Sequence, residues 1–229
     1  MRQKHETKAW IALYAALLAV PLVFLRSPYY QDIVFLVYIK AILAVSWNIT
    51  GGYAGVFSIG HSVYFGLGAY TVVLLSKRLG ISPWIGTLAG ACVALAASLT
   101  LGRVLLKLQS MFFTLATSAS LLIFYHLAPY LRGLTGGWAG ISLARQPGFA
   151  NMMFRSGVWY SLIGAVLLIL AVVLSRRVRS SKIGYYFMAL REDEMAASAT
   201  GVNVQTYKII ALSISAVITA VVAGLATAH

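Results

Sequence analysis

Charged side chains are scarce in this chain: they make up 10% of its 229 residues, whereas hydrophobic residues make up 60%. Soluble domains usually carry about a quarter charged residues. The mean hydropathy of +0.84 points the same way, because only a lipid environment tolerates so apolar a chain. These values exclude an ordinary soluble domain and predict an integral membrane protein.

Acidic residues are scarcer still, with five Asp and Glu against eighteen Lys and Arg, which gives a formal net charge of +13. In a soluble protein this balance would indicate a nucleic-acid partner. Here the basic residues stand in short clusters between apolar runs. We therefore interpret them as signals of membrane topology and predict no nucleic-acid partner.

Residues that carry chemistry are also missing. The one cysteine, Cys92, lies inside an apolar run, where we expect a small buried filler. GxSxG, HExxH and the phosphate-binding Gly-Lys-Ser/Thr are absent. No carboxylate or second histidine lies at ligand spacing from His61, and His126 stands alone in another run. We predict no metal, no cofactor and no catalytic residues, although an intramembrane enzyme remains a rival that would need such a set.

Long apolar runs are what the sequence does contain. A membrane-spanning helix needs roughly 17 to 25 mostly apolar residues. Candidate runs cover 9–25, 33–50, 55–76, 83–102, 111–131, 157–175 and 207–228. No long polar stretch separates them, so we predict one transmembrane domain, residues 1–229. Its fold class is an all-α polytopic helix bundle with about seven membrane segments, of which 55–76 either crosses or re-enters.

The basic residues predict the orientation of these runs. If the N-terminus is cytoplasmic and every run crosses, the inner side receives Arg2, Lys4, Lys8, Arg103, Lys107, Arg176, Arg177, Arg179, Lys182, Arg191 and Lys208. The outer side receives the smaller set of Arg26, Lys77, Arg78, Arg132, Arg145 and Arg155. The positive-inside rule then favours a cytoplasmic N-terminus. Lys40 falls inside the second run, where it either faces a water-filled path or snorkels to an interface.

Glycine is concentrated in residues 51–68, at positions 51, 52, 55, 60, 66 and 68. Two interpretations fit this stretch. Small residues let helices pack closely in membranes. Alternatively, a broken helix offers its backbone groups to a substrate, which is tolerated at membrane depth only against protein or a water-filled cavity.

Two polar loops complete the pattern. The loop 176–206 opens with four basic residues and then holds three consecutive acids, Glu192 to Glu194, in a stretch of helix formers that stops at Gly201. We interpret it as a short cytoplasmic helix that serves as a docking knob, with a solvated linker as the alternative. The loop 132–156 carries Trp138 and Phe149, which fit an interfacial belt or a partner surface.

Four motifs occur in one order along residues 40–225. They are Tyr53-Ala54-Gly55-x-x-Ser58-x-Gly60-His61 with Phe65-Gly66-x-Gly68-Ala69-Tyr70-Thr71, then 107–117, then Thr135-Gly136-Gly137-x-x-Gly140-Ile141, and then Arg191-Glu192-Asp193-Glu194-x-Ala196-Ala197-x-x-x-Gly201. Together they resemble the membrane permease subunits of branched-chain amino acid ABC importers. Val56, Ser110 and Phe112 depart from the residues usual there. Family members also usually continue past the position of His229, so we expect a short or truncated permease.

The resemblance implies a transport subunit of the bacterial inner membrane that is not an enzyme. Its partners would be ABC ATPase subunits, a second homologous permease subunit and a periplasmic substrate-binding protein. The residues implied to dock on the ATPase are Glu192, Asp193, Glu194, Ala196, Ala197 and Gly201. The residues implied to shape the translocation pathway are Gly51, Gly55, Ser58, Gly60, His61, Gly66 and Gly68. The solute would be a branched-chain amino acid or a related small polar molecule, since related permeases also take urea and short amides. An ATP-independent channel or scaffold is the alternative, and it would not need the acidic docking loop.

Overall fold

The computed structural model describes residues 2–23, 27–108, 110–141, 148–154 and 156–228, and most of these are helical. The long helices are α1 (Arg2–Val23), α2 (Pro28–Trp47), α3 (His61–Leu79), α4 (Pro83–Leu105), α5 (Ser110–Tyr130), α7 (Gly157–Ser180) and α10 (Val204–Ala228). The short ones are the π-helix η1 (Asn48–Tyr53), α6 (Arg132–Thr135), η2 (Gly137–Ala139), η3 (Phe149–Asn151), α8 (Lys182–Glu192) and α9 (Glu194–Ala199). No strand occurs in this described part, and the predicted all-α bundle is confirmed.

Five helical segments in the described residues are long and apolar enough to cross a membrane. They are Pro28–Tyr53, Pro83–Leu105, Met111–Tyr130, Gly157–Ser180 and Val204–Ala228. Each corresponds to one of the predicted runs. The runs 9–25 and 55–76 correspond to α1, whose apolar part is the shorter Leu13–Leu22, and to α3. The count of seven crossings stays a prediction.

The run 55–76 is a broken segment. Helix α2 continues into the π-helix η1, and residues 54–60 then form no helix before α3 begins at His61. The Val56 amide donates to the Thr50 carbonyl at 3.0 Å and so closes the turn. π-Helical turns are rare and are frequent at functional sites. The chain thus reverses direction through irregular backbone, which one of the two interpretations of the glycine stretch predicted.

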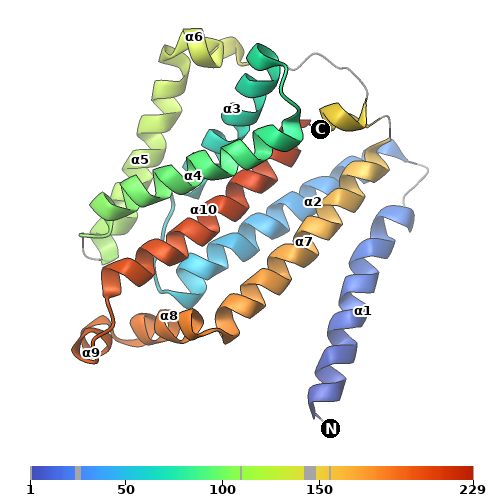
Figure 1. The fold of residues 1–229 in the computed structure, drawn as a ribbon. Coiled ribbons are helices and arrows are strands. Elements are labelled where there is room, and N and C mark those ends of the chain that lie inside the picture. Colours follow the sequence, from blue (N-terminus) through green and yellow to red (C-terminus); the bar gives the residue numbers. More distant parts are fainter. Residues whose placement is uncertain (1, 24–26, 109, 142–147, 155, 229) are drawn as a thin grey trace.

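The two ends of the bundle are distinct (Figure 1). One end carries the start of α1, the connection between α4 and α5, and the helices α8 and α9. The other end carries the start of α2, the connection between α3 and α4, α6, and the end of α10. We name these the inner end and the outer end, following the predicted orientation.

The core lies around α10, which packs against α2, α3 and α4. Small residues set this packing: a Cβ built on Gly68 of α3 would lie 2.8 Å from the Ala220 Cα of α10. Helix α4 also comes close to this glycine: a Cβ on Gly90 of α4 would lie 3.1 Å from the Gly68 carbonyl oxygen. Close approach of helix backbones is how membrane helices associate. Cys92 on α4 is exposed, so its expected role as a buried filler is wrong.

Candidate functional site

The glycine-rich segment and the loop 176–206 meet at the inner end. Arg191, in the last turn of α8, donates from Nη1 to the Gly52 carbonyl at 2.8 Å. Gly55 has φ +68°, and a Cβ built on it would lie 3.1 Å from the Arg191 Cα. Only glycine suits a left-handed backbone pressed this closely against another chain segment. The turn after η1 therefore rests directly on α8.

Residues 57–60 are held against α5. The Ile59 amide donates to the Thr117 hydroxyl at 3.2 Å, and the Thr114 hydroxyl donates to the Phe57 carbonyl at 2.8 Å. A Cβ on Gly60 would lie 3.0 Å from the Thr117 carbonyl oxygen. Ser58 is buried, and its carbonyl accepts from Trp47 Nε1 at 2.8 Å. In this conformation the non-helical backbone is satisfied by protein side chains, as membrane depth requires.

A buried polar cluster joins the start of α3 to α2 and α10. His61 Nε2 lies 2.6 Å from the Ser215 hydroxyl. Ser46 of α2 lies 3.0 Å from both the Ser215 and the Thr219 hydroxyls of α10. Ser46 and Ser215 also donate to each other's carbonyl at 2.7 Å. Hydrogen bonds of this kind act as glue between membrane helices. The first residue of α3 is thus tied to the helix at the centre of the bundle.

The sequence analysis missed Ser46, Ser215 and Thr219. Each is a small polar residue inside an apolar run, and all three are buried. These three residues are buried together because α2 packs on α10. Spacing along a single run therefore cannot reveal them. Such residues at membrane depth usually face the inside of the bundle.

A cavity of about 640 Å³ opens between α3 and α5 toward the outer end. Ser62, Gly66 and Tyr70 line it from α3, and Phe124 and Tyr125 line it from α5. Residues 134–140 border it at the outer end. A Cβ on Gly66 would meet no atom within 4 Å, so this glycine leaves the cavity wide. The mix of apolar surface with a few hydroxyl groups is typical of small-molecule sites.

The predicted pathway residues therefore fall into separate places. Gly66 lines the outer cavity, whereas Gly68 packs on α10 and Gly51 packs against the Trp47 ring, at 2.6 Å for a built Cβ. The structure brings Gly55 to α8, Ser58 to Trp47 of α2 and Gly60 to α5, and it places His61 in the polar cluster. Close packing is found at Gly51 and Gly68. That the broken segment offers backbone groups to a substrate stays a prediction.

The docking loop forms two short helices where the sequence analysis expected one. Asp193 has extended backbone, and its Oδ1 accepts from the amides of Met195 and Ala196 at 2.8 and 3.0 Å, which caps α9. Asp is a strong N-cap residue, and an acid there suits the helix dipole. The single predicted helix is wrong because Asp193 ends α8 and starts α9. Gly201, with φ +89°, ends α9.

The remaining docking residues divide by exposure. Ala197 is buried, while Glu192 and Ala196 are exposed. Glu194 Oε1 accepts from Lys208 Nζ at the start of α10, and the Lys208 side chain is largely buried. Met195 at the tip is 84% exposed. A protruding apolar side chain among carboxylates is a surface that a protein partner can cover.

Lys40 lies on an exposed face of α2, near the middle of the span Pro28–Tyr53. At about 1.5 Å per residue, roughly 18 Å of helix separates it from either end of that span. This distance is longer than a lysine side chain, so the placement favours a polar group or water facing Lys40 over snorkelling.

Within the described residues no cluster of three or more His, Cys, Asp or Glu side chains lies close enough to hold a metal ion. The geometry consists instead of a docking surface, a braced broken helix, a buried polar cluster and a cavity.

Comparisons with known proteins agree with the motifs. Residues 29–229 match the family model described as "Branched-chain amino acid transport system / permease component". The chain is 28% identical over 222 residues to the "High-affinity branched-chain amino acid transport system permease protein LivM" of Escherichia coli, and 27% identical to the protein of that name from Salmonella typhimurium. Both matches cover 87% of this chain and 52% of the relative. The chain thus spans about half the length of these curated relatives.

No solved structure matches the chain. The family model, however, covers most of the sequence and includes every motif that carried the resemblance. The chain belongs to the family of branched-chain amino acid transport system permease components.

Proposed function

We propose that this chain is the membrane-spanning permease subunit of an ATP-driven bacterial importer for branched-chain amino acids or a related small polar solute. The observation that carries the proposal is the contact of Arg191 with Gly52 and Gly55. It joins the exposed docking loop to the broken segment that leads into α3. A channel or scaffold that works without ATP has no need for such a link.

The proposed mechanism starts on the docking loop. ATP is bound by partner ATPase subunits, because this chain has no nucleotide motif. The ATPase contacts Met195 and the carboxylates around it and displaces α8 and α9. Helix α9 is tied to α10 through Glu194 and Lys208, so both ends of the loop pass on the displacement.

The displacement then reaches the pathway. Arg191 moves the turn at residues 52–55, and residues 57–60 carry the motion past α5 to His61. Because His61 is bonded to Ser215, α3 tilts about the polar cluster. Tilting α3 against α5 changes the width of the outer cavity at Gly66. Two packings of one bundle give alternating access without covalent chemistry.

The other partners are assigned to the remaining surfaces. A periplasmic binding protein delivers the solute at the outer end, where Trp138 is 77% exposed. A second permease subunit covers faces that this chain leaves exposed, such as that of α5. Lys40, exposed at mid-span, then faces this subunit or the solute path between the two.

The test is to tag the chain at the native locus, extract it in mild detergent and identify what comes with it by mass spectrometry. We expect an ABC ATPase and a second permease of the same family. Uptake of labelled leucine, isoleucine and valine should fall when the locus is deleted, and uptake of urea should not. Recovery of the chain alone, under conditions that preserve a known ABC complex, would favour the channel or scaffold. A fall in urea uptake with unchanged amino-acid uptake would reassign the solute.

A further inference from the structure

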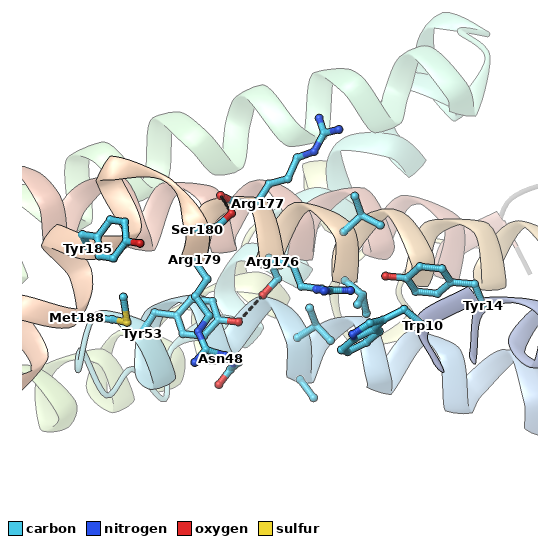
Figure 2. Close-up of a pocket in the computed structure, with 15 residues that line it drawn as sticks. Trp10, Tyr14, Asn48, Tyr53, Arg176, Arg177, Arg179, Ser180, Tyr185 and Met188 are labelled. Carbon is cyan, nitrogen blue, oxygen red and sulfur yellow. Dashed lines mark hydrogen bonds between the residues drawn. The ribbon is translucent and has the colours of Figure 1, made fainter. Parts of the chain in front are cut away.

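A second cavity, of about 1200 Å³, lies at the inner end between α1, α2 with η1, α7 and α8 (Figure 2). Trp10 and Tyr14 line it from α1, Asn48 and Tyr53 line it from η1, and Arg176 and Arg179 line it from α7. It shares no lining residue with the outer cavity. The proposed transport path does not use it.

This cavity is strongly basic. Arg176 and Arg179 are one helical turn apart, and Figure 2 shows Arg176 extending toward Trp10 and Arg179 toward Asn48 and Tyr53. The Arg177 side chain extends away from those of Arg176 and Arg179. Among the lining residues whose side chains the structure describes, none is acidic. Both ion pairs found in the described residues belong to the docking loop, so neither neutralises these guanidinium groups.

Neutral groups complete the site. The Arg176 guanidinium lies 4.0 Å from the centre of the Trp10 ring, which holds it in place by a cation–π contact. The Tyr53 hydroxyl is bonded to the Ser175 hydroxyl at 3.0 Å, and the Asn48 side chain is exposed beside Arg179. Arginine forks match phosphate geometry, and their bonds to phosphate oxygens are charge-assisted. The chemistry of the site is that of a phosphate group.

The walls change character with depth. The polar lining residues Asn48, which begins η1 directly after α2, and Arg176 of α7 are at the inner end. The residues one turn deeper on the same helices, Ala44 with Val45 and Val172 with Val173, also line the cavity and are apolar. A soluble phosphate compound needs no apolar wall, whereas a phospholipid places its phosphate at the membrane surface and its acyl chains beneath. Basic pockets between membrane helices are known to take anionic headgroups.

We propose that this cavity binds the phosphate of an anionic phospholipid from the leaflet at the inner end, with its acyl chains against the apolar wall that α2 and α7 form. The lipid bridges α1 to α7. It also contacts Tyr185 and Met188 of α8, the helix that carries Arg191. Bound lipid therefore fixes α8 relative to the bundle. The proposal requires that this chain lies in a membrane. It does not depend on which solute is transported.

The test is a lipid titration of the purified full chain in detergent, followed by native mass spectrometry. The probes are phosphatidylglycerol, phosphatidylcholine and inorganic phosphate. The variant is Arg176→Gln with Arg179→Gln. The matched control is Arg103→Gln with Lys107→Gln, which removes the same charge from exposed positions at the same end, away from the cavity. A Lys version of the variant, Arg176→Lys with Arg179→Lys, keeps the charge and guards against loss of folding.

We expect phosphatidylglycerol to bind at least about tenfold more tightly than phosphatidylcholine, which corresponds to about 1.4 kcal/mol. The Gln variant should lose that preference, the control should keep it, and the Lys variant should keep part of it. Inorganic phosphate should not compete at millimolar concentration. Equal binding of the two lipids would overturn the proposed site. So would an equal loss of the phosphatidylglycerol preference in the Gln variant and in the control. Full competition by inorganic phosphate would overturn the assignment to a lipid.

Discussion

Two membrane-spanning helices, α10 and α5, differ in how much of their surface the rest of the chain covers. In the most apolar part of α10, 67% of the residues are buried, against 11% in α5. Helix α10 contacts Gly68 and His61 of α3 and Ser46 of α2, and these contacts hold the bundle together. Helix α5 contacts the broken segment and the outer cavity, and it leaves its other face for lipid or a partner. The comparison separates a core that the chain itself buries from a helix face that the chain leaves uncovered.

The largest effect on the buried core around α10 is expected from a substitution at Gly68. A side chain there meets the backbone of α10, so Gly68→Ala should destabilise the bundle by about 1–3 kcal/mol, the usual range for an overpacked core. Thermal unfolding in detergent measures the change. The matched control is Gly66→Ala, two residues away, where a Cβ meets nothing. If both variants unfold alike, the α3–α10 contact does not determine stability.

A second effect, on coupling, is expected where the docking loop leads into α10. Gly201 has φ +89° and no neighbour within 4 Å of a built Cβ, so Gly201→Val acts through backbone strain of about 1–3 kcal/mol. ATP-dependent uptake should fall several-fold while ATP hydrolysis continues. Gly201→Asn should retain coupling, because asparagine tolerates the left-handed conformation. Coupled uptake at the normal rate in the Val variant would remove Gly201 from the docking role.

The smallest effect concerns the hydroxyl groups of the two helices. Ser215 of α10 bonds across to α2 and α3, whereas Ser120 of α5 bonds to the Ala116 carbonyl of its own helix. Ser215→Ala should cost about 1 kcal/mol, as hydrogen bonds between membrane helices do. Ser120→Ala should leave the unfolding temperature unchanged. Equal shifts for the two variants would show that the cluster adds nothing specific.

The same contrast shows what could be predicted from sequence. Long apolar runs give the helices, and the glycines at 51–60 give the break before α3, because both signals are local. The contact of Arg191 with Gly52 joins residues 139 positions apart, so no spacing along the chain reveals it. Likewise, nothing local distinguishes Gly66 at a cavity from Gly68 in a helix contact. Asp193 was predicted to dock, and its place as a helix cap was missed.

The central claim is that Arg191 carries motion from the docking loop to the glycine-rich segment. The most direct measurement compares ATP hydrolysis with solute uptake in proteoliposomes that hold the whole complex with Arg191→Ala. Arg177→Ala is the control, an exposed arginine at the same end whose side chain makes none of these contacts. The account predicts normal ATP hydrolysis with greatly reduced uptake in the Arg191 variant and normal coupling in the control. Normal uptake per ATP in the Arg191 variant would contradict it.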